Sequence, residues 1–149
     1  MAEMEAASAP ESLPKKIRKA LEDLERAGET PVMALPAVPR RYQDEKAMAF
    51  ARIGAFDEAK ISSWIVVTDK NLIFVRSGLL RNRMDRFPLS GITGIEYVKE
   101  FQDNTIKIRI GETAEDVRFY HEIDGVRFYR HVKAVLEGRD LKEEAGEEG

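Results

Sequence analysis

The residues of this chain that could take part in catalysis are few, and the densest group lies around His121. Glu122 and Asp124 follow this histidine closely, and an imidazole beside carboxylates can transfer protons or bind a metal ion. The same residues also suit a strand end followed by the start of a helix. The second histidine, His131, falls at the margin of a helical apolar face. We favour the structural interpretation for both histidines.

The common enzyme motifs are absent: the chain has no glycine-rich phosphate loop, no HExxH motif and no Gly-x-Ser-x-Gly elbow. It contains no cysteine, which excludes thiolate nucleophiles and zinc sites with sulfur ligands and fits a reducing compartment. No apolar run reaches the roughly 20 residues of a spanning helix, and residues 1–12 lack the pattern of a signal peptide. We therefore expect a cytoplasmic protein that is not an enzyme and uses no cofactor or metal ion.

Two groups of basic residues could instead recognise an anionic partner. The first lies between Arg76 and Arg86, where Arg81 and Arg83 are interleaved with leucines. An exposed loop of this composition could bind anionic membrane lipid through Arg81, Arg83 and Arg86, with the leucines inserted. We favour a simple turn with solvated arginines, because Asp85 dilutes the charge and the whole chain has a net charge of −3. The same net charge and the lack of an aromatic platform argue against nucleic-acid binding.

The second basic group lies on a predicted strand pair, Thr105 to Ile110 and Val117 to Tyr120. Strict alternation puts four apolar residues on an inner face: Ile106, Ile108, Val117 and Phe119. Parity then puts four others on the outer face: Lys107, Arg109, Arg118 and Tyr120. Like charges on neighbouring strands are unfavourable unless an anionic partner covers them, so this face is the best candidate for an interaction surface. The alternative is that the long side chains extend into water or reach acids of an adjacent strand.

The elements that position these residues begin with an amphipathic helix at residues 12–28. Ser12 suits the N-cap, Pro14 the first turn and Gly28 the C′ position, and apolar residues recur between them at helical spacing: Leu13, Ile17, Leu21 and Leu24. The charges oppose the helix dipole, with basic residues first and acidic residues last, so the helix must dock its apolar stripe. We expect it to dock on its own chain; docking on a second copy, which would give a homodimer, is the alternative.

Strand patterns follow this helix. Three prolines restrict Val32–Val38 to an edge strand or an extended segment. Gln43–Arg52 fits either a short helix or a strand, and Gly54 ends it in either case. Ile61–Thr68 and Leu72–Val75 predict a central hairpin, apolar on both faces, with Asn71 in the left-handed conformation. Further strands are expected at Arg86–Leu89, at Ile92–Lys99 with a bulge near Gly91 and Gly94, and at the two segments of the basic pair. A last helix is expected from an N-cap at Asp124 to about Glu137, closed by Gly138, with Phe128, Val132 and Val135 on its core face.

Strands grouped between two helices indicate an α+β fold with six or seven antiparallel strands. A sheet of this length must curl and be covered, because open edges promote aggregation. The compositions of residues 1–11 and 139–149 predict a disordered amino terminus and an acidic disordered tail. The expected organisation is therefore a helix at residues 12–28 followed by one domain at residues 29–138.

The ordered set of strands resembles bacterial pleckstrin-homology-like (PH-like) domains over about residues 30–137. The run Trp64-Ile65-Val66-Val67-Thr68-Asp69-Lys70-Asn71-Leu72-Ile73-Phe74-Val75 is similar to their central hairpin, in which a Thr-Asp-Lys turn joins two apolar strands. Phe87-Pro88-Leu89 with Ile92-Thr93-Gly94-Ile95-Glu96 resembles the next strand pair, and Thr105-Ile106-Lys107-Ile108 with the helix from Gly125 completes the likeness.

This resemblance implies a partly open antiparallel barrel of about seven strands with a C-terminal helix at one end, to which the N-terminal helix is an addition. It implies no catalytic residue, because PH-like domains are recognition modules. Eukaryotic relatives often bind phosphoinositides through a basic loop after the first strand. Here Arg40 and Arg41 alone could serve, beside Asp44 and Glu45, so the lipid function is not inherited. We expect a non-catalytic recognition or scaffold module that binds a protein partner, with a second copy of the chain as one candidate; binding to anionic lipid through the arginine-rich loop is the alternative.

Overall fold

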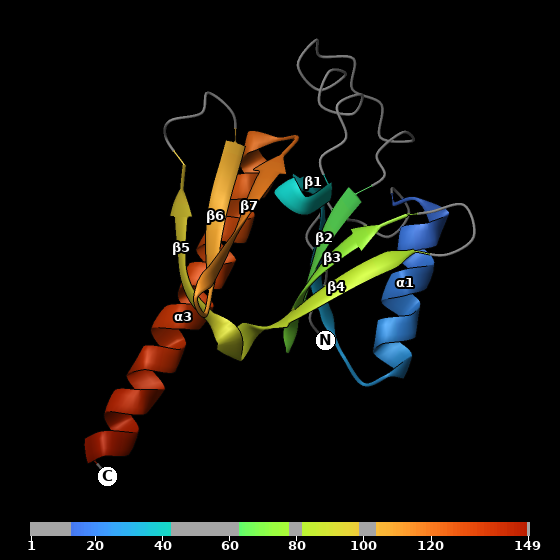
Figure 1. The fold of residues 1–149 in the computed structure, drawn as a ribbon. Helices are drawn as coiled ribbons and strands as arrows, with labels where there is room; N and C mark the ends of the chain where they lie inside the picture. The colour runs from blue at the N-terminus through green and yellow to red at the C-terminus, as the bar shows by residue number, and fades with distance from the viewer. Residues whose placement is uncertain (1–12, 43–62, 78–81, 99–103, 149) are drawn as a thin grey trace.

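A computed structural model of the chain describes residues 13–42, 63–77, 82–98 and 104–148. Within these residues, seven antiparallel strands form one sheet in the order β4-β3-β2-β1-β7-β6-β5, which curls into a partly open barrel (Figure 1). The strands are β1 (Pro31–Pro39), β2 (Ser63–Thr68), β3 (Asn71–Arg76), β4 (Arg83–Pro88), β5 (Ile92–Tyr97), β6 (Asn104–Ile110) and β7 (Thr113–Phe119). The 3-10 turn η5 (Leu89–Gly91) joins β4 to β5. With one helix before the sheet and one after it, the predicted α+β fold is confirmed.

Strand β1 is central in this order, so the predicted edge position is wrong. Its registers with its two neighbours do not overlap, because residues 31–36 pair with β2 and residues 37–39 pair with β7. Each proline of β1 therefore lies where only one side of the strand is paired, which is locally an edge and tolerates a missing N–H. The change of partner at Pro36 and Ala37 carries the sheet from one half of the barrel to the other.

The predicted hairpin is confirmed as β2 and β3, but Asn71 does not adopt the left-handed conformation. No described residue other than glycine has a positive φ. The turn is made by Asp69 and Lys70, and the Thr68 hydroxyl accepts hydrogen bonds from the backbone N–H groups of Lys70 at 3.1 Å and Asn71 at 2.9 Å. This threonine turn stabilises the reversal without a left-handed residue.

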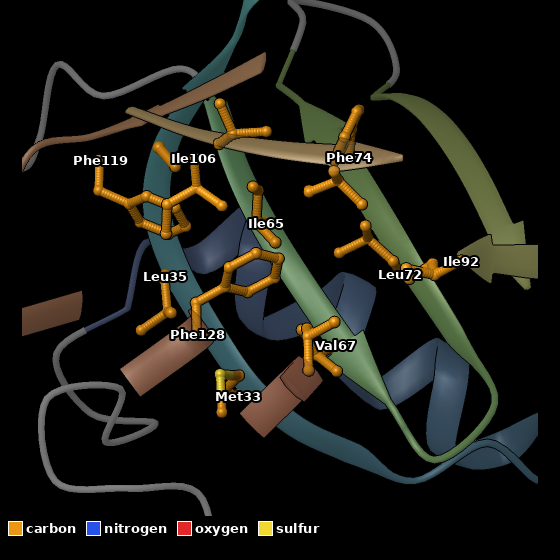
Figure 2. Close-up of a cluster of buried hydrophobic side chains, with 14 of the residues drawn as sticks. Met33, Leu35, Ile65, Val67, Leu72, Phe74, Ile92, Ile106, Phe119 and Phe128 are labelled. Carbon is orange, nitrogen blue, oxygen red and sulfur yellow. The ribbon is translucent and has the colours of Figure 1, made fainter. Parts of the chain in front are cut away.

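Alternate residues of the strands fill the barrel interior (Figure 2). The four residues predicted to face inward are all buried there: Ile106, Ile108, Val117 and Phe119. The predicted bulge is also confirmed, since the register of β5 on β6 shifts between Ile92 and Gly94. The sequence therefore predicted the register of this half of the sheet correctly.

Helix α1 (Lys15–Arg26) covers the outer face of β1–β3, so the prediction that it docks on its own chain is confirmed. Its apolar stripe and the outward residues of the strands form a second cluster: Leu13, Ile17, Leu21, Leu24, Ala34, Trp64, Val66, Ile73 and Val75. The helix begins after Pro14, whose carbonyl accepts from the N–H groups of Ile17 and Arg18 at 3.0 Å; the predicted cap, Ser12, lies outside the described residues. It ends at Arg26, and Gly28 occupies the predicted C′ position with a φ of +86°.

Helix α3 (Glu122–Glu148) covers β5–β7 from the barrel side, with Phe128 and Val132 buried in the core. It begins two residues before the predicted cap Asp124 and continues past Gly138, so both predicted ends are wrong. The acids of its first turn favour the early start because they complement the helix dipole. One glycine disfavours a helix by only about 1 kcal/mol, and good helix formers follow Gly138. The helix therefore enters the segment that was predicted to be a disordered tail.

Candidate functional site

The arginine-rich segment does not form one surface. Residues 83–88 belong to β4, and successive side chains of a strand point to opposite faces. Arg83 points into the barrel, where its Nε lies 3.3 Å from Asp85 Oδ2 and its guanidinium lies 4.9 Å from the centre of the Tyr42 ring. Arg86 points outward to a different partner. Arg81 lies outside the described residues, so in the described part of the chain the predicted lipid-binding arginines are separated.

Arg86 is paired with Glu29 in a polar cluster beside the hairpin turn. Its Nη1 donates to Glu29 Oε2 at 3.0 Å, and the Thr68 hydroxyl donates to Glu29 Oε1 at 2.7 Å. The side-chain amide of Asn71 donates to the same oxygen. Burial alone would raise the pKa of Glu29, but these hydrogen bonds outweigh it and hold the pKa below its ordinary value. Glu29 therefore fixes the end of α1 to the β2–β3 turn.

A charged cluster closes the mouth of the barrel at the end of β1. Arg41, in the 3-10 turn η3 (Arg40–Tyr42), donates to both carboxylate oxygens of Glu115 on β7 at 2.8 Å. Its guanidinium also lies 3.5 Å from Asp85 Oδ1, and 5.9 and 5.2 Å from the ring centres of Phe74 and Phe87. The hydrogen bond to Glu115 raises the pKa of Arg41. This side chain connects strands from both halves of the sheet.

Tyr42 extends the same cluster. Its hydroxyl donates to Asp85, and burial together with the nearby carboxylate raises the pKa of Tyr42. Burial would raise the pKa of Asp85 as well, but the hydrogen bond from Tyr42 and the charges of Arg83 and Arg41 hold it below its ordinary value. Two arginines face two carboxylates, so the charges of the mouth balance internally. Among the described residues, the charges at the mouth are therefore balanced, which fits a structural role.

No local sequence pattern predicts this cluster. Arg41 and Glu115 are 74 residues apart, and Tyr42 and Asp85 are 43 apart. Arg40 and Arg41 were considered only as remnants of a basic lipid-binding loop. Arg41 is engaged at the mouth, and Arg40 points outward with Nη1 3.6 Å from Asp116 Oδ2. Partners that the fold alone brings together leave no local pattern to recognise.

Lys107, Arg109 and Arg118 lie on one face of the sheet, as predicted, but acidic residues alternate with them on that face. Asp116 lies opposite Lys107, Ala114 opposite Arg109, and Thr105 opposite Arg118, so no two basic residues are directly opposed. Arg109 donates to Glu96 of β5 at 2.9 Å and is more than half exposed. Lys107 and Arg118 are partly buried. The expected repulsion between like charges is therefore relieved by acids of the same face.

Tyr120 was predicted to share this face and instead belongs to its border. It follows β7 and packs against the α1 cluster, and burial raises its pKa. We define the β5–β7 outer face by five residues: Glu96, Lys107, Arg109, Asp116 and Arg118. No described helix covers it, because α3 packs on the barrel side and α1 on the other half of the sheet. Of the described elements, therefore, neither helix packs on this face.

The histidines show no arrangement for catalysis within the described residues. His121 is exposed between β7 and α3, whereas Asp124 is buried in the first turn of the helix. Burial lowers the pKa of His131. No three histidine, cysteine, aspartate or glutamate residues of the described ranges are grouped as metal ligands. Of the helices that the structure describes, none is long and apolar enough to cross a membrane.

Comparison with known proteins agrees with this geometry. A family model described as bacterial PH domain matches residues 42–132, which include strands β2–β7 and the buried part of α3. No curated protein and no solved structure matches the chain. The match omits α1 and β1, so the helix that covers the outer face of the first strands lies outside the matched residues.

Proposed function

Because this chain belongs to the bacterial PH domain family, we propose that it is a non-catalytic recognition module that binds a protein partner across the β5–β7 outer face. The observation that carries this proposal is a charged sheet face on which neither described helix packs. It presents three basic side chains against two acidic ones, on a chain whose net charge is −3. A local positive surface on an acidic protein favours an acidic partner and disfavours unspecific contacts.

The character of the face supports a protein partner. Its charges are arranged in mixed order, with Glu96 beside Arg109 and Asp116 opposite Lys107. Such an order can select a partner by charge complementarity, whereas a lipid surface requires positive charge alone. The cysteine-free composition supports a cytoplasmic location for this binding.

Lipid binding through Arg81, Arg83 and Arg86 has less support. Arg83 contacts Asp85 and the Tyr42 ring at the rim of the barrel mouth, and Arg86 pairs with Glu29 on the opposite face of β4. Both would have to leave these partners to reach one membrane surface. Phosphatidylglycerol vesicles provide the direct comparison, and we expect them to leave the β5–β7 outer face unoccupied.

Site-specific crosslinking in the source cell tests the proposal. Ala114 is exposed and lies opposite Arg109 on this face, whereas Ala134 is exposed on α3. A photo-crosslinking residue at position 114 should give a discrete protein adduct that Arg109→Glu removes. The same residue at position 134 is the matched control and should give none. Equal adducts at both positions, or an adduct insensitive to Arg109→Glu, would refute binding at this face.

A further inference from the structure

The amino-terminal half of α1 is a concentrated basic surface that the recognition function does not use. Lys15, Lys16, Arg18 and Lys19 are all exposed, and the acids of the helix begin only at Glu22. Positive charge at this end opposes the helix dipole, and Lys15 and Lys19 repel each other one turn apart. Within the described ranges no ion pair involves Lys15, Arg18 or Lys19. The described part of the chain thus leaves the positive charge of these three residues without an ion pair.

The fold determines where this half-helix lies on the sheet. The carboxyl end of α1 is fixed at the β2–β3 turn, where Lys70 Nζ donates to the Gly28 carbonyl at 3.5 Å. A helix of 12 residues spans about 18 Å, so its amino end lies at the other end of these strands. There β3 ends at Arg76, which lies opposite Arg83 and so faces the barrel side, away from α1. The basic surface is therefore formed by the basic residues of α1 alone.

A complementary acidic segment lies at the other terminus of the same chain. Helix α3 continues to Glu148, and from residue 143 onward the sequence has four acidic residues and no basic residue: Glu143, Glu144, Glu147 and Glu148. In Figure 1 this end of α3 projects from the barrel on the side away from α1. The backbone of this helix end thus lies away from α1.

We propose that the acidic end of α3 in one copy docks on the basic half of α1 in a second copy. The contact is heterologous, so repeated docking leads to a ring or an open chain of molecules. It depends on attraction between opposite charges and must weaken as salt shortens the Debye length. The acids before α1, Glu3, Glu5 and Glu11, are more widely spaced than the four glutamates of the tail. This favours the second copy over the chain's own amino terminus as the occupant.

Sedimentation velocity over a dilution series, at about 0.01 M and about 0.5 M salt, tests the proposal with two variants. Lys15→Glu/Lys19→Glu reverses the basic surface, and it suits the helix dipole, so α1 should remain folded. Glu143→Lys/Glu147→Lys reverses the acidic segment. The unmodified chain should associate at low salt, and each variant alone should sediment as a monomer. An equimolar mixture of the two variants should associate again, because each supplies the charge that the other lacks.

Arg130→Glu/Lys133→Glu changes the net charge equally on the exposed side of α3 and serves as the control, which should associate like the unmodified chain. A monomer at every concentration and salt would overturn the proposal, as would variants that associate normally or a mixture that stays monomeric. The proposal would also be overturned if the chain did not associate and bound phosphatidylglycerol vesicles through Lys15, Arg18 and Lys19. That result would show that the basic half of α1 binds a membrane. None of these variants alters the β5–β7 outer face, so the two proposals fail separately.

Discussion

Arg41 and Glu115 face each other across the mouth of the barrel and share two hydrogen bonds of 2.8 Å, although they are 74 residues apart in the chain. The pair joins the end of β1 to β7, and Asp85 on β4 approaches the same guanidinium. One side chain therefore connects the two halves of the curled sheet. This connection holds strand β7, and with it one row of the β5–β7 outer face, at a fixed position.

We expect Arg41→Ala to lower the free energy of unfolding by about 1–3 kcal/mol, since it leaves the largely buried Glu115 carboxylate without its partner. The neighbouring Arg40→Ala is the control. Arg40 is mostly exposed and only 3.6 Å from Asp116, so its loss should change stability by less than about 1 kcal/mol. Urea denaturation of both variants makes the comparison. Equal effects would show that the bidentate pair does not stabilise the barrel.

The protein should lose stability in acid because of Glu29 and Asp85. Both have a lower pKa in the folded chain than in the unfolded chain, so the unfolded chain binds more protons as the pH falls. Their contribution is complete above the unfolded values of about 4 and is lost as the pH falls through the folded values. Glu29→Gln should have a lower melting temperature at neutral pH and a shallower decline in acid. Parallel curves for the variant and the unmodified chain would contradict this assignment.

Trp64 reports on the docking of α1. It is the single tryptophan and is only 3% exposed beneath the helix, so its fluorescence should be blue-shifted. Trp64→Ala should destabilise by about 3–5 kcal/mol. Trp64→Phe should destabilise less, because Trp64 Nε1 has no hydrogen-bond partner among the described residues that would be lost. Ile17→Asp should detach the helix and shift the emission toward that of a solvated indole; unchanged emission would mean that α1 does not cover Trp64.

Alanine substitutions at two glycines, Gly28 and Gly91, test whether backbone strain or lack of space for a side chain determines stability. A Cβ at Gly28 or at Gly91 would meet no atom within 4 Å, but only Gly28 has a positive φ, +86°. At this position the N–H groups of Gly28 and Glu29 bond to the carbonyls of Glu25 and Leu24, which is the Schellman pattern. Gly28→Ala should therefore destabilise by about 1 kcal/mol, whereas Gly91→Ala should be neutral. Calorimetric melting of the two variants distinguishes them, and a neutral Gly28→Ala would refute the strain.

Periodic sequence patterns correctly predicted which residues of a single helix or strand are buried. The alternation in β6 predicted which isoleucines are buried, and the spacing of Ile17, Leu21 and Leu24 predicted the buried side of α1. The predictions were wrong where the structure depends on contacts between residues far apart in the sequence or on a side-chain hydrogen bond. Proline chemistry marked β1 as an edge, and only the change of partner from β2 to β7 explains its central place. The left-handed Asn71 was wrong because the Thr68 hydroxyl stabilises the turn instead.

The candidate site was predictable in part for the same reason. Parity placed Lys107, Arg109 and Arg118 on one face, which needs only the register of two strands. It did not place Asp116 opposite Lys107 or Glu96 beside Arg109, because those neighbours depend on how three strands align. The arginines of β4 were grouped by composition and are separated by the alternation of the strand. The mouth cluster required contacts over 43 and 74 residues, which no local pattern reveals.

The most direct test of the recognition function is the affinity of Arg109→Glu/Arg118→Glu for the partner captured at position 114, measured by titration calorimetry beside the melting temperature. The account predicts at least a tenfold loss of affinity, or about 1.4 kcal/mol. The melting temperature should change little, since partly exposed charges contribute about 1 kcal/mol or less each to stability. Binding that equals that of the unmodified chain, in a folded double variant, would contradict the assignment of this face.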